Sequence, residues 1–174
     1  MFKLLTAAAA LLLVATPASA EVIARTADGF TLRYQLAMES TPDDILSTMS
    51  HVGDWWDSAH TYSGDARNIT IDMTPGGCWC ETLPNGTDFR HGTVVAVETD
   101  RLAFNAPFGP LNGKATRADL TVTWPGENRG WMVTWVMAVE GPGLGAYADG
   151  VDAVMGAGFN RFTHYLEYGE AAAS

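Results

Sequence analysis

The C-terminal part of the chain carries the pattern that most restricts the fold, a long amphipathic helix. After Tyr147, apolar residues recur at intervals of three or four, at Val151, Met155, Phe159, Phe162 and Leu166. This spacing is that of one face of an α-helix, sustained over about five turns. The pattern is interrupted by Gly150, Gly156 and Gly158, each of which costs about 1 kcal/mol relative to alanine in a helix interior. Small residues there leave room for close packing or for a bound molecule.

Most of the remaining chain is predicted to form antiparallel strands. Residues 22–38 alternate apolar and polar side chains around a turn at residues 27–29, and Thr41 and Pro42 begin a helix that runs to His51. Glycines and prolines separate further predicted strands at residues 68–73, 77–83, 88–98, 102–105, 117–124 and 131–140. This order predicts a single-domain α+β fold, in which a curved antiparallel sheet wraps around the long C-terminal helix.

The N-terminal segment has the organisation of a secretory signal peptide. Lys3 precedes an apolar run over residues 4–14, and small residues follow up to Ala20, so cleavage is predicted between Ala20 and Glu21. The run is shorter than the roughly 20 residues that span a bilayer. We therefore expect a periplasmic or secreted mature chain, residues 21–174, without a membrane span. The formal charge of −10 argues against nucleic acid as a partner, and the sequence leaves the oligomeric state open.

A predicted hairpin is centred on Asn85-Gly86, a dipeptide typical of a two-residue type I′ turn. That turn would place Glu81 opposite Arg90, Trp79 opposite Gly92, and Cys80 opposite His91. One face of the hairpin then carries Cys78, Cys80, Phe89 and His91, and the other carries Trp79, Glu81 and Arg90. We favour the cysteine face as inward, because an ion pair is less costly in water. A single β-bulge would invert this assignment.

The two cysteines allow three kinds of chemistry. Residues i and i+2 of an extended strand lie about 6.7 Å apart, at the upper limit for a disulfide, so we favour buried free thiols over a bond between Cys78 and Cys80. With His91 the two thiols supply three ligands of the kind that zinc prefers, and His60 or a water could be the fourth. Cys80 and His91 could also form a thiolate–imidazole pair. The sequence predicts no required cofactor.

Aromatic residues and methionines are the other candidates for a binding site. Trp135 and Met137 alternate on one predicted strand, and Phe104 and Phe108 follow the middle of the sheet. Ordinary core packing explains most of them, but the same residue types beside a glycine-bearing helix would also line an apolar pocket. His60 lies in a predicted loop after the Trp55-Trp56 pair, where functional residues often occur.

Together these features resemble the START/polyketide-cyclase (SRPBCC) superfamily, and in particular its small bacterial members related to the activator-of-heat-shock-ATPase domain. The resemblance covers residues 22–169 and rests on the element order and on Trp55-Trp56, Gly76-Gly77-Cys78-Trp79-Cys80-Glu81, His91-Gly92-Thr93-Val94 and Phe108-Gly109-Pro110-Leu111. It implies a helix-grip fold that encloses a pocket for lipids, polyketides or other apolar molecules. A signal peptide would separate this chain from a cytosolic ATPase, so the chaperone-activator role is not expected.

The leading hypothesis is an exported protein that binds a hydrophobic or aromatic small molecule between the sheet and the C-terminal helix. The alternatives are a cyclase- or hydrolase-like enzyme that uses His60, Tyr62 or His91, or Glu81 if the hairpin faces are inverted, and a zinc-dependent function at Cys78, Cys80 and His91. The predicted ligand-binding residues are Trp55, Trp56, Cys78, Cys80, Phe89, Phe104, Phe108, Trp135, Met137, Met155 and Phe159.

Overall fold

Antiparallel strands dominate the computed structural model, which describes residues 19–127 and 130–172. The sheet order in these residues is β1-β2-β9-β7-β6-β5-β4-β3, with β8 paired to β9. The strands are β1 (Ser19–Thr26), β2 (Gly29–Met38), β3 (Ile69–Ile71), β4 (Cys78–Thr82), β5 (Asp88–Val97), β6 (Arg101–Asn105), β7 (Arg117–Thr123), β8 (Gly126–Glu127) and β9 (Gly130–Glu140).

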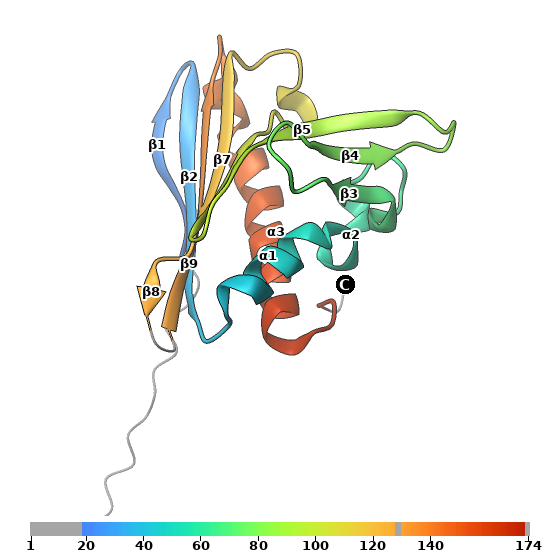
Figure 1. The fold of residues 1–174 in the computed structure, drawn as a ribbon. Helices are drawn as coiled ribbons and strands as arrows, with labels where there is room; N and C mark the ends of the chain where they lie inside the picture. The colour runs from blue at the N-terminus through green and yellow to red at the C-terminus, as the bar shows by residue number, and fades with distance from the viewer. Residues whose placement is uncertain (1–18, 128–129, 173–174) are drawn as a thin grey trace, which may run out of the picture.

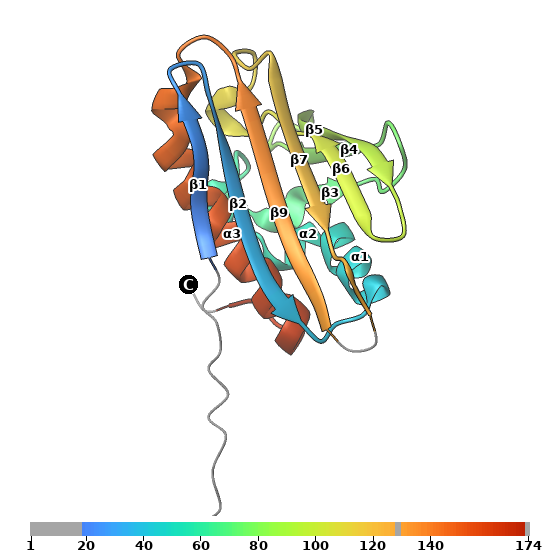
Figure 2. The ribbon, with the colours of Figure 1, turned by 90° about the vertical axis from the view of Figure 1, so that its left-hand side faces the viewer.

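Three α-helices of the described residues pack against one face of this sheet: α1 (Pro42–Ser50), α2 (Val52–Trp55) and α3 (Ala148–Tyr168) (Figures 1 and 2). Thr41 caps α1 in a reciprocal hydrogen-bonding pattern with Asp44. Gly169, at φ 71°, ends α3 in the left-handed conformation that glycine adopts without strain. The predicted α+β helix-grip fold, with a curved sheet around the C-terminal helix, is confirmed.

The core forms where the long strands face α3. Alternate residues of β7 and β9 point inward, and Leu120, Val122, Trp135 and Met137 are fully buried, because successive strand side chains point to opposite faces. From α3, Phe159 packs edge-to-face on Trp135, with ring centroids 5.4 Å apart. Side chains therefore fill the space between the long strands and the C-terminal half of α3.

The predicted signal peptide lies largely outside the described residues, which begin at Ser19. The predicted cleavage point falls within β1, where Ala20 pairs with Tyr34 and Glu21 with Arg33. None of the described helices combines the length and apolar character needed to cross a bilayer.

The hairpin of β4 and β5 extends away from strands β1, β2, β9 and β7 (Figure 1). Its tip is a three-residue loop rather than the predicted two-residue type I′ turn: the Leu83 N–H donates to Thr87 O over 2.8 Å and the Gly86 N–H donates to Leu83 O over 2.8 Å. Gly86 has a positive φ, of 79°. This pattern is a type I turn followed by a left-handed glycine, and Pro84 suits the first central position of such a turn.

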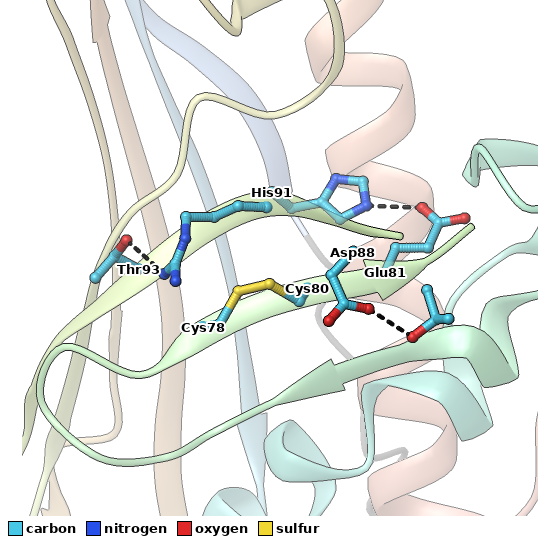
Figure 3. Close-up of a disulfide and its surroundings, with 8 residues drawn as sticks. Cys78, Cys80, Glu81, Asp88, His91 and Thr93 are labelled. Atoms are coloured by element: carbon cyan, nitrogen blue, oxygen red, sulfur yellow. Dashed lines mark hydrogen bonds and ion pairs between the residues drawn. A yellow bond between two sulfur atoms is a disulfide. The ribbon is translucent and has the colours of Figure 1, made fainter. Parts of the chain in front are cut away.

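The extra loop residue shifts the register near the tip, and a β-bulge restores the predicted register further on. Glu81 lies opposite Phe89 and Cys80 opposite Arg90, so the two pairings predicted for these residues are wrong. Beyond an irregularity between Trp79 and Cys80, Trp79 lies opposite Gly92, as predicted. The bulge leaves His91 without a directly opposed partner on β4, and its side chain turns to the same side as Glu81 (Figure 3).

Candidate functional site

A cavity of about 520 Å³ lies between the N-terminal part of α3, the β4–β5 hairpin, and the loops at residues 56–62 and 108–110. Its wall is largely aromatic and aliphatic, with Trp79 from β4 and Val151 and Val154 from α3. Six residues proposed from the sequence line this cavity: Trp56, His60, Tyr62, His91, Phe108 and Met155. The cavity is of a size that holds small organic ligands.

Five other proposed ligand-binding residues lie in the filled part of the core and do not line the cavity. Their exposed fractions are at most 1%, for Trp55, Phe104, Trp135, Met137 and Phe159. Trp135 packs on Trp55 and on Phe159, with ring centroids 6.1 Å and 5.4 Å apart, and Phe104 packs on the cavity-lining Trp79 at 5.3 Å. Phe89 lies next to the cavity, and its ring packs on Tyr62 at 4.7 Å and on His91 at 4.9 Å.

The cysteine face of the hairpin points away from the cavity, opposite to our prediction. Trp79 and Glu81 are the buried residues of β4, with exposed fractions of 2% and 0%, whereas Cys78 and Cys80 are half-buried on the other face. The prediction failed because it assigned Glu81 to an ion pair in water. In the structure Glu81 has a buried partner, His91, which only the bulge brings to its side.

Cys78 and Cys80 form a disulfide, with their Cα atoms 5.3 Å apart (Figure 3). Our preference for free thiols was therefore wrong, because the strand is contracted at this point compared with the roughly 6.7 Å of an extended strand. The disulfide lies on the opposite face from His91, so these three residues cannot ligate one zinc ion or form a thiolate–imidazole pair. No cluster of three metal-ligating side chains occurs among residues 19–127 and 130–172.

His91, which lines the cavity, is paired with the buried Glu81 behind it. His91 Nε2 lies 2.7 Å from Glu81 Oε2 (Figure 3), and the Glu81 carboxylate also accepts a hydrogen bond from the Ser63 backbone N–H. Burial raises the pKa of Glu81, but hydrogen bonds from Ser63, from the Tyr62 backbone and from His91 outweigh burial and hold the pKa below its ordinary value. Glu81 is therefore an ionised carboxylate at neutral pH.

Tyr62 covers one face of the His91 imidazole. The two rings are stacked, with centroids 5.7 Å apart and planes inclined by 17°, and Tyr62 itself is 55% exposed. His60 lies in an adjacent short 3₁₀ turn, Ser58–His60, in which the Asp57 side chain accepts a hydrogen bond from the Ala59 backbone N–H. The structure thus brings the three proposed catalytic residues His60, Tyr62 and His91 to one cavity, with Glu81 directly behind His91.

Trp56 forms another wall of the cavity because α3 carries a glycine beneath it. A Cβ atom on Gly158 would collide with the Trp56 indole ring. The Trp56 Nε1–H donates to the His60 backbone oxygen over 3.3 Å, which ties this wall to the loop at residues 56–62. Of the three glycines that interrupt the helical pattern, Gly158 is the one that permits this close packing.

Sequence reasoning missed several lining residues, among them Trp79, Tyr147 and Val154. Helical periodicity could have identified Val154, because residues 151, 154 and 155 are neighbours on one face of α3. For Trp79 the signal was its own large aromatic side chain, which favours a buried position, but the choice of face gave more weight to the polar Glu81 on the same face.

Neither known protein-family models nor curated protein sequences match this chain. Solved structures do resemble it. Protein NE0264 from Nitrosomonas europaea has a TM-score of 0.55 at 14% identity, over 78% of this chain and 93% of that one. The Aha1 dimer from Colwellia psychrerythraea has a TM-score of 0.57 at 10% identity, over 80% of this chain and 97% of that one. The di-domain ARO/CYC StfQ from the steffimycin biosynthetic pathway has a TM-score of 0.54 at 11% identity, over 82% of this chain and 52% of that one. These likenesses establish a common fold.

Proposed function

We propose that this chain is an exported member of the START/polyketide-cyclase superfamily that binds a hydrophobic or aromatic small molecule. The observation that carries the proposal is the cavity of about 520 Å³, with its aromatic and aliphatic wall. Pockets for small organic molecules are concave, mostly apolar and contain few polar groups, and this cavity has that character. The fold shared with StfQ and Aha1 supports the proposal.

Export is supported by the composition of residues 1–20. Intact-mass measurement on protein from the periplasmic fraction of a bacterial host should give a chain that starts at Glu21. A chain that retains its N-terminal segment in the cytoplasm would contradict export.

Filling the cavity should abolish ligand binding. Val154 lines the cavity from α3, whereas the neighbouring Ala153 is exposed and does not line it. We expect Val154→Trp to weaken the binding of naphthalene at least tenfold in equilibrium dialysis, because the indole would occupy the space of the probe. Ala153→Trp is the matched control and should bind naphthalene as wild type does. Equal binding by wild type and Val154→Trp would exclude this cavity as the site.

A second candidate function is proton-transfer catalysis, which the His91–Glu81 pair favours. A histidine oriented by a buried carboxylate is a common arrangement for a general base. In this reaction His91 Nδ1 would take a proton from the carbon next to a carbonyl group and leave an enolate, while the Nε2 proton stays hydrogen-bonded to Glu81. The reverse transfer would return a proton to that carbon.

Hydrogen exchange tests this candidate without knowledge of the natural substrate. In D₂O, wild-type protein should accelerate deuterium incorporation next to the carbonyl group of 2-tetralone, measured by NMR. We expect His91→Ala to lower the protein-dependent rate about 100-fold. A rate that survives this substitution would exclude His91 as the base.

A further inference from the structure

His91 is almost completely buried, yet it lines the cavity. Its exposed fraction is 7%, and most of its surroundings are accounted for by protein groups. Tyr62 stacks on the ring, Phe89 packs edge-to-face on it, and Glu81 occupies the Nε2 edge. The edge that carries Nδ1 has no hydrogen-bond partner in the part of the chain that the structure describes, so it is the edge available to a bound molecule.

Glu81 determines which hydrogen bond that edge can form. An ionised carboxylate only accepts hydrogen bonds, so the proton between Glu81 and His91 belongs to Nε2. In the neutral imidazole the other nitrogen then carries a lone pair and no proton. In that neutral form Nδ1 is an acceptor, and its natural partner is a ligand group that donates a hydrogen bond.

The other polar side chains of the cavity are placed differently. His60 is exposed, Tyr62 is 55% exposed, and the Tyr147 hydroxyl accepts a hydrogen bond from Lys114 Nζ over 2.8 Å. The wall also contains the large rings of Trp79 and Phe108, whose centroids are 4.9 Å apart. The site thus combines one buried acceptor with an aromatic enclosure.

We propose that the cavity selects aromatic molecules that carry a phenolic or enolic hydroxyl group, which donates a hydrogen bond to His91 Nδ1. This inference rests on the proposed binding function and narrows its ligand class. Buried carboxylate ligands are disfavoured, because a second negative charge would lie close to ionised Glu81. Unsubstituted aromatic hydrocarbons would fit the space but leave Nδ1 unpaired, at a cost in affinity.

Three probes of similar size test the selection: naphthalene, 2-naphthol and 2-naphthoate. For wild type we expect 2-naphthol to bind about tenfold more tightly than naphthalene, the effect of one buried hydrogen bond, and 2-naphthoate to bind most weakly. In His91→Phe the ratio between 2-naphthol and naphthalene should fall to about one. His164→Phe, which changes a histidine of α3 outside the cavity, is the matched control and should keep the wild-type ratio.

A second measurement uses the unaltered protein and does not depend on the folding of a variant. The ¹⁵N resonance of His91 Nδ1 should move when 2-naphthol is added and stay in place with naphthalene at equal occupancy. Equal affinities of the two probes for wild type, an unmoved resonance, or 2-naphthoate as the tightest ligand would each overturn the inference. Naphthalene binding that is lost in Val154→Trp would still uphold the cavity as a binding site, so the two failures are distinguishable.

Discussion

Replacing Trp55 with alanine is expected to lower the free energy of unfolding by about 4 kcal/mol. Trp55 is fully buried and joins three parts of the fold. Its ring lies 5.4 Å from Phe162 of α3 and 6.1 Å from Trp135 of β9, and its Nε1–H donates to Thr48 O of α1 over 2.7 Å. Alanine would leave a large void and remove the indole hydrogen bond to Thr48 O, which would keep only the His51 N–H as a donor among the described residues. Urea unfolding followed by far-ultraviolet circular dichroism measures the change.

Tyr168→Ala is the control for the loss of an aromatic ring. Tyr168 is also part of a helix, α3, but is 61% exposed, so its removal should change the free energy of unfolding by no more than about 0.5 kcal/mol. A loss below about 2 kcal/mol for Trp55→Ala would show that Trp55 is not a principal core residue.

The patterns that were predicted correctly are those in which a repeat extends over many residues. The apolar positions from Val151 to Leu166 predicted α3, and the alternation along residues 117–124 and 131–140 predicted β7 and β9. In each case many apolar side chains indicate the same buried face, so one irregular residue does not change the predicted element. The arrangement of one long helix on an antiparallel sheet followed from these elements.

The hairpin was predicted less well because its faces are nearly balanced in polarity. One face of β4 carries Trp79 and Glu81, and the other carries Cys78 and Cys80. A buried glutamate is uncommon unless it has a partner, and here the partner reaches Glu81 only through a bulge that no sequence pattern predicts.

The division between cavity and core could not be predicted from the sequence either. Trp135 fills the core and Trp79 lines the cavity, and only the tertiary arrangement separates their roles.

The Glu81–His91 pair should also be important for stability. We expect Glu81→Ala to lower the free energy of unfolding by about 3 kcal/mol at pH 7, because hydrogen bonds to a charged group are lost and the buried donor of His91 and the half-buried N–H of Ser63 remain unpaired. Glu98→Ala is the matched control. Glu98 forms an exposed ion pair with Arg101 at 3.1 Å, and such pairs contribute about 0–1 kcal/mol. Urea unfolding of the three proteins measures both losses.

The loss of unfolding free energy caused by Glu81→Ala should become smaller as the pH falls. The pKa of Glu81 is lower in the folded protein than its ordinary value, which for glutamate is about 4.3. The carboxylate therefore contributes its full stabilisation above that value, and the contribution is lost as the pH falls through the folded-state pKa. The difference in unfolding free energy between wild type and Glu81→Ala should be largest near neutral pH and shrink below about pH 4. A difference that grows on acidification would mean that Glu81 is protonated in the folded state. Glu81 would then donate the hydrogen bond to His91 Nε2, and Nδ1 would carry the proton and act as a donor.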